Sequence, residues 1–212
     1  MGTNKEGKIW SVCSALLELF EKDTKRFFLP IISCLVKKYS SPSKVSSDST
    51  SYATTDGIDD ALLRIQAMRS HNPKLAIEGL SFLSLLVTGE GGGGDRLFDA
   101  ALGVYDFDLV LFVAENASQK DPKEYLPFLN ELKLLPQGED YRKYKIDMYL
   151  KKYKSALKHI GQHIHRRVTS IGENIEAEMP TEEQECLNLI KDQRLYSEAL
   201  NLFCVSSTSP DK

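Results

Sequence analysis

A short pattern occurs three times in the sequence and limits the fold more than any other feature. An aromatic residue is followed, three, four and seven positions later, by alanine, leucine and a large apolar residue, at residues 98–105, 153–160 and 196–203. These four positions lie on one face of an α-helix. The small alanine lets a second helix approach closely beside the aromatic ring, as in tetratricopeptide-type repeats. The expected packing residues are Phe98, Ala101, Leu102, Tyr153, Ala156, Leu157, Tyr196, Ala199 and Leu200.

A chance match between ordinary amphipathic helices is the alternative explanation of this pattern. Its copies stand at unequal intervals, so any repeat is degenerate. Other signals favour helices: Asn72-Pro73 and Asp121-Pro122 are typical helix starts, and Thr181 to Gln184 form a capping box. The apolar run 109–114 also fits a strand, but its neighbours are helical, so we expect a buried helix. The sequence therefore predicts an all-α fold, a degenerate tetratricopeptide-like solenoid of stacked helix pairs.

We expect residues 1–212 to form a single helical-repeat region. Asp23 or Thr24 is expected to cap the second helix, and Pro30 to kink or break it. The expected parts, in order, are a helix pair at 8–38, a Ser-rich flexible loop at 39–56, helical repeats at 58–165 with a Gly-rich loop at 89–94, a loop at 166–180 and a terminal helix pair at 181–205.

The composition is that of a globular protein, with 42% apolar and 27% charged residues and a net charge of −3. The four cysteines contain no C-x-x-C pair, which favours buried free thiols in a reducing compartment over a structural zinc site. Neither a signal peptide nor an apolar run of the roughly 18 residues that a membrane span needs is found. We expect a protein of the cytoplasm, with the nucleus as a second compartment, and no membrane contact.

The charge is concentrated in residues 141–168, which carry +8 against −11 in the remainder of the chain. Four tyrosines interleave with these bases, so this basic stretch could contact RNA phosphates and stack on bases. Alternatively, the tyrosines belong to the core and the bases form a solvated face. The candidate RNA-binding residues are Arg142, Lys143, Lys145, Lys151, Lys152, Lys154 and Lys158.

The other sequence patterns lack residues that a catalytic or metal site needs. His159 and His163 share a helix face, but no acidic or cysteine ligand is apparent beside them in the sequence. The glycine run ends in Asp95 and lacks the Gly-Lys-Ser/Thr of a phosphate-binding loop. No G-x-S-x-G element is present. We therefore expect no catalytic residue, no metal, no cofactor and no enzymatic activity.

Several segments resemble the family of the largest subunit of the Elongator complex, also called IKAP. They are residues 8–17, 22–37, 105–111, 118–130 and 185–192, and the stretch from Tyr105 to Asn130 is the most specific. The resemblance touches most of this chain but only part of the helical-repeat region of that longer protein. The chain departs from the family pattern at the serine-rich loop, at the glycine-rich loop and within 161–180.

This resemblance implies a scaffold segment that works through protein–protein assembly. The family's large subunit holds the catalytic subunit, which modifies wobble uridines in transfer RNA. The implied partners are the other Elongator subunits, including the catalytic one, with transfer RNA contacted indirectly. The alternative function is an RNA-contacting helical module that uses residues 141–168.

Overall fold

The structure, a computed structural model, describes residues 3–39, 57–87, 93–117, 120–171 and 181–205. These residues form eleven α-helices and one short 3-10 helix, and no strand occurs among them. The all-α prediction is thereby confirmed. The described helices do not form the single region that we expected, because the chain divides into two compact units, Met1–Tyr125 and Leu126–Lys212. The second unit buries a hydrophobic cluster of its own, which explains the division.

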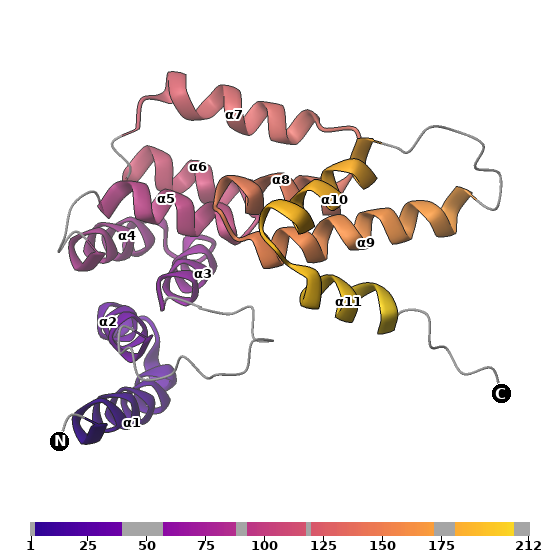
Figure 1. Cartoon of the computed structure of the whole chain (residues 1–212). Coiled ribbons are helices and arrows are strands. Elements are labelled where there is room, and N and C mark those ends of the chain that lie inside the picture. Colours follow the sequence, from indigo (N-terminus) through magenta and orange to yellow (C-terminus); the bar gives the residue numbers. More distant parts are fainter. Residues whose placement is uncertain (1–2, 40–56, 88–92, 118–119, 172–180, 206–212) are drawn as a thin grey trace. The chain divides into compact units, whose positions relative to one another are not determined.

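The first unit consists of helix pairs (Figure 1). Each helix packs on the next in a pair, α1 on α2, α3 on α4 and α5 on α6, and α2 and α4 also pack on the following pair. This is the stacking that a solenoid requires. The elements are α1 (Thr3–Phe20), η1 (Glu21–Asp23), α2 (Phe28–Tyr39), α3 (Gly57–Arg69), α4 (Pro73–Val87), α5 (Gly93–Gly103) and α6 (Phe107–Asn116).

The start of α2 corrects two expectations. Pro30 is the third residue of the helix, where a backbone N–H has no intrahelical acceptor, so the proline neither kinks nor breaks it. Neither Asp23 nor Thr24 is the N-cap of α2, because the helix begins only at Phe28. Asp23 accepts a hydrogen bond at Oδ1 from the backbone N–H of Arg26 (3.2 Å) and so closes the turn that precedes α2.

Close packing between α2 and α4 depends on a glycine. A Cβ atom added at Gly79 would lie 2.5 Å from Cε1 of Phe28 and 3.0 Å from Cδ1 of Ile32. Both apolar side chains are almost completely buried. The missing side chain of Gly79 therefore provides the space into which α2 packs.

The helix starts follow the sequence signals. The side chain of Asn72 accepts a hydrogen bond from the N–H of Leu75 (3.2 Å) ahead of α4. Residues 109–114 lie in α6, whose N-cap Asp106 accepts hydrogen bonds from the N–H groups of Asp108 and Leu109. The apolar run is thus helical, because capping and burial together outweigh its β-like composition.

The second unit is organised around one long helix, α9 (Tyr153–Ile171). The helices α8 (Glu139–Tyr149), α10 (Thr181–Asp192) and α11 (Tyr196–Val205) all pack on α9. The helix α7 (Pro122–Leu134) begins in the first unit and lies mostly in the second. Its start is fixed by Asp121, whose Oδ1 accepts a hydrogen bond from the N–H of Lys123 (2.9 Å).

Some expected loops are shorter than predicted. The helix α9 continues to Ile171, so the predicted loop 166–180 is wrong for its first six residues. Contacts from Arg167 to α10, described below, stabilise this last part of the helix. Gly93 and Gly94 belong to α5 and Tyr39 to α2. The other residues of the predicted loops 39–56, 89–94 and 166–180 lie outside the described residues.

Candidate functional site

The first two copies of the recurring pattern form packed helix faces. Phe98, Ala101 and Leu102 are buried in the first unit, where the ring of Tyr125 lies 6.0 Å from that of Phe98. In the second unit Ala156 and Leu157 are buried, and Tyr153 is partly buried against the same cluster. The other buried members of this cluster are Tyr141, Tyr144, Ile160, Cys186, Leu189 and Leu195.

The third copy packs differently from the expectation. Tyr196 and Leu200 are 56% and 62% exposed, so their assignment as packing residues is wrong, while Ala199 is partly buried. The buried face of α11 starts one residue earlier, at Leu195, and continues through Ala199 to Leu202. This face docks on a glycine of α9, since a Cβ atom at Gly161 would lie 2.6 Å from Cδ2 of Leu202.

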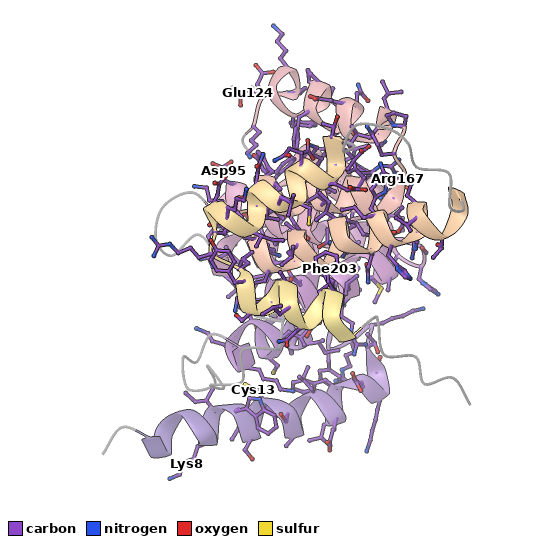
Figure 2. All side chains as sticks on the ribbon, turned by 45° about the vertical axis from the view of Figure 1, so that its right-hand side comes forward. Lys8, Cys13, Asp95, Glu124, Arg167 and Phe203 are labelled. Atoms are coloured by element: carbon purple, nitrogen blue, oxygen red, sulfur yellow. The ribbon has the colours of Figure 1, made fainter. Side chains whose placement is uncertain are left out.

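An apolar stripe is consequently exposed on α11. Tyr196, Leu200 and Phe203 stand at i, i+4 and i+7 and are all exposed (Phe203 is labelled in Figure 2). A second stripe occurs on α1, where Ile9, Val12 and Leu19 are exposed although their spacing is that of a buried face. Contiguous exposed apolar side chains are typical of surfaces that bind other proteins.

Most of the candidate RNA-binding bases are already engaged within the second unit. Arg142 donates from Nε to the carbonyl oxygen of Leu132 (2.9 Å). Lys143 pairs with Glu139 (2.7 Å) in the same helix. Two further pairs join helices, Lys145 to Glu185 (3.0 Å) and Lys154 to Glu198 (2.7 Å).

The two arginines at the end of the basic stretch are also paired. Arg166 lies 2.6 Å from Oδ2 of Asp140. Arg167, labelled in Figure 2, contacts Glu182 at 3.0 Å and Glu183 at 2.9 Å, both in the first turn of α10. The sequence of this unit contains 13 basic and 13 acidic residues, so its formal charge is zero. The +8 of residues 141–168 is therefore compensated inside the unit to which they belong.

Four of the candidate lysines are exposed, and one of them is Lys154, which pairs with Glu198. Lys151 and Lys152 lie at the turn between α8 and α9, where Lys151 has φ of 57°, and Lys158 lies on α9. The tyrosines do not form a stacking surface around them. Tyr141 and Tyr144 are buried, and the exposed Tyr149 already packs on Phe128, with 4.7 Å between ring centroids.

A buried acid–histidine pair escaped the sequence analysis. Asp147 of α8 is 0% exposed, and its Oδ2 lies 2.8 Å from Nδ1 of His159 on α9. The expectation that His159 has no acidic neighbour is wrong, because the turn at residues 150–152 brings the facing helices together. His163 lies against Tyr141, with 5.4 Å between ring centroids. Among the described residues, no group of three or more His, Cys, Asp or Glu side chains is arranged to hold a metal ion.

Two buried thiols, Cys34 and Cys186, are in surroundings that slow their reaction as nucleophiles. Burial, with a smaller contribution from the charge of Glu183, raises the pKa of Cys186 to about 11. Burial also raises the pKa of Cys34. A nucleophilic cysteine needs the opposite shift, because the thiolate is the reactive form.

The sequence matches a family model described as the ELP1 alpha-solenoid over residues 2–132. The chain is 38% identical to Elongator complex protein 1 of Rattus norvegicus over 210 residues, which are 96% of this chain and 13% of that protein. It is 40% identical to the Drosophila melanogaster protein of the same name over 154 residues, 73% of this chain and 10% of the relative. With the Saccharomyces cerevisiae protein the identity is 36% over 110 residues, 46% of this chain and 8% of the relative.

The chain spans only about an eighth of the length of the mammalian relatives that it matches. None of the described helices combines the length and the apolar character that crossing a membrane requires.

Proposed function

Because the chain belongs to the ELP1 alpha-solenoid family, we propose that it is a section of an Elongator scaffold, acting through protein–protein contacts without a reaction of its own. Its partners are the other Elongator subunits, including the catalytic subunit. Through them it supports modification of wobble uridines in transfer RNA, with transfer RNA contacted only indirectly. Cytoplasm and nucleus are its proposed compartments.

The observation that carries this proposal is the exposed apolar stripe of α11. Tyr196 and Leu200 lie exposed along one side of α11. Phe203, also exposed, continues this stripe at its edge, where its Cζ approaches Gly161 beside the anchoring Leu202. Aromatic side chains that cover a large area at low conformational cost are enriched at the centres of protein interfaces. Because the opposite face of α11 is packed on α9, the stripe is already in position, and little conformational entropy is lost when a partner binds.

The chemistry of the described side chains supports the absence of catalysis. The charged groups of α8 to α11 bind one another, and the one deeply buried carboxylate is occupied by His159. Cys34 and Cys186 are buried and their pKa values are raised, the opposite of what a nucleophilic thiol needs. Such groups stabilise a fold and do not favour proton transfer or nucleophilic attack.

Co-purification tests the proposal. The chain, carrying an affinity tag, is expressed in cells and the recovered Elongator subunits are quantified. The double variant Tyr196→Asp, Leu200→Asp places two carboxylates on the stripe and is expected to lower recovery at least about tenfold, since central interface residues contribute about 2 kcal/mol or more.

The matched control is Asn201→Asp, which adds a carboxylate to the same helix at an exposed polar position outside the stripe. Equal recovery from wild type and the double variant would refute the role of the stripe. Failure of the wild-type chain to recover any Elongator subunit would refute the proposed function itself.

A further inference from the structure

Two buried cysteines face each other across the first helix pair. Cys13 of α1, labelled in Figure 2, and Cys34 of α2 are both free thiols, and each is 8% exposed. Cys13 is near enough to contribute, through its charge and side-chain hydrogen bonding, to the raised pKa of the Cys34 thiol, and α1 packs directly on α2. The sulfur atoms therefore lie close together in the interface between the two helices.

The register of the helix pair explains this proximity. Cys13 lies seven residues before the end of α1 at Phe20, and Cys34 lies six residues after the start of α2 at Phe28. With a rise of about 1.5 Å per residue, both cysteines stand roughly 10 Å from the closed end of the hairpin. They consequently occupy the same level on two facing helices.

Contacts on both sides of the cysteines fix the same register. At the closed end, the rings of Phe20 and Phe27 stack with 5.0 Å between their centroids. One turn beyond the cysteines, Nζ of Lys38 lies 5.0 Å from the ring centroid of Trp10. Contacts on both sides of the cysteines thus fix the position of Cys13 opposite Cys34. If α1 slid along α2, the ring stacking at the closed end and the Lys38–Trp10 contact would both be lost.

We propose that Cys13 and Cys34 are a redox-sensitive pair, which a small-molecule disulfide such as glutathione disulfide converts into an intramolecular disulfide joining α1 to α2. One protein thiolate attacks the glutathione disulfide, forms a mixed disulfide and releases one glutathione thiolate. The second protein thiolate then attacks the protein sulfur of the mixed disulfide and releases the other. The two protein thiols are oxidised, and their protons end on the two glutathione thiols that are formed.

Burial sets the rate of this exchange. The attacking species is a thiolate, and burial together with the neighbouring Cys13 raises the pKa of Cys34. The reaction is therefore slow at neutral pH and accelerates as the pH rises. Cys186 provides the comparison within the same chain, because no second cysteine is found among the described residues of its buried cluster.

The test uses the full chain, incubated with glutathione disulfide at a pH of about 8, near the pKa of a free thiol. Remaining thiols are alkylated and the digest is mapped by mass spectrometry. We expect a peptide pair linked through Cys13 and Cys34, with loss of two hydrogen atoms from the chain and full reversal by dithiothreitol. The variant Cys186→Ser is expected to form the same link.

Two further samples make the result decisive. The variant Cys34→Ser removes the resolving thiol, so Cys13 should retain a glutathione adduct that wild type does not accumulate. Wild type unfolded in urea should instead form mixed cysteine pairings or glutathione adducts. That difference would show that the folded structure selects the Cys13–Cys34 pair. Two results with folded wild type would overturn the proposal. Either both thiols stay as open to alkylation as Cys186, or one of them carries glutathione and no cross-link forms. Both results come from wild type, so they do not depend on whether Cys34→Ser folds.

Discussion

The two compact units use the same helix pairs but hold them together differently. In the first unit, large apolar side chains such as Phe28 and Ile32 pack into the space left by Gly79. In the second, the helices that surround α9 are joined to it or to one another by ion pairs. Among the described residues, the only buried charged side chains are Asp140 and Asp147, and both belong to the second unit.

This difference shows that the charge of a sequence segment does not predict a charged surface. Residues 141–168 have the composition of a nucleic-acid-binding segment, yet their partners are carboxylates of α8, α10 and α11. Both units have apolar cores, and the second adds ion pairs with buried or half-buried carboxylates to that packing. Each of the following variants tests one side of that comparison.

The largest effect is expected from Phe28→Ala in the first unit. Removal of this buried ring leaves a cavity beside Gly79 and should lower the free energy of unfolding by about 3–5 kcal/mol. Urea unfolding at low and high salt measures the loss, which should not depend on salt because no charge is involved. The control Leu85→Ala changes an exposed side chain of the same unit and should stay within about 0.5 kcal/mol. A loss below about 1 kcal/mol for Phe28→Ala would contradict apolar packing as the main support of this unit.

The second effect is expected from Asp147→Ala, which leaves His159 without its buried partner. Removing one partner of a hydrogen bond in a largely buried site costs about 1–3 kcal/mol. Hydrogen exchange should accelerate in α8 and α9, while α1 to α4 remain unchanged. Asp192→Ala, at an exposed position at the end of α10, is the control and should have little effect. Equal exchange in wild type and Asp147→Ala would show that the pair does not hold these helices together.

A smaller, pH-dependent effect is expected at the contact between α9 and α11. Hydrogen bonds from Lys154 and Ser197 lower the pKa of Glu198 from 4.5 to about 2. A depressed carboxyl pKa adds stability that is fully present above the unfolded value of about 4.5 and is lost as the pH falls towards 2. Because Lys154 is half exposed, we expect about 1 kcal/mol, not the larger value that the shift alone would give.

The measurement is hydrogen exchange of α11 between pH 5 and pH 3, corrected for the intrinsic exchange rate. Wild type should lose protection over this range. Glu198→Gln should begin with the lower protection and change less, because its side chain does not titrate. A wild-type profile as flat as that of the variant would show that the ion pair does not stabilise the docking of α11.

The smallest effect is expected from the double variant Lys151→Ala, Lys152→Ala. Both lysines are exposed at the turn before α9, so the free energy of unfolding should change by no more than about 0.5 kcal/mol. If the chain acts as a scaffold, any transfer-RNA affinity should also be unchanged, as measured by filter binding at several salt concentrations. A marked loss of affinity with a shallower salt dependence would favour the RNA-contacting alternative.

Local patterns predicted the helices and part of the core, whereas the pairing between distant residues could not be foreseen. The spacing of Ala156 and Leu157 identified a buried face because it depends only on helical periodicity. For α11 the same logic selected Tyr196 and Leu200, because nothing local reveals that Leu195, one residue before the helix, begins the packed face.

The ion pairs also could not be predicted from local sequence patterns. Glu185 lies 40 positions from Lys145, so their contact exists only once α8 and α10 have been brought together. Asp147 and His159 are closer, at 12 positions, on the two helices that flank the turn at residues 150–152. An acidic residue within a basic stretch, facing a histidine on the next helix, was the available signal for this pair.

The most direct test of the scaffold proposal is reconstitution from purified components at high salt. The chain is mixed with purified Elongator subunits, treated with ribonuclease and analysed by size-exclusion chromatography with light scattering at about 1 M salt, where the Debye length is about 3 Å. Because the proposed contact is apolar and does not involve RNA, the chain should co-elute with at least one subunit. Separation of the chain from every subunit after ribonuclease treatment or at high salt would contradict the account.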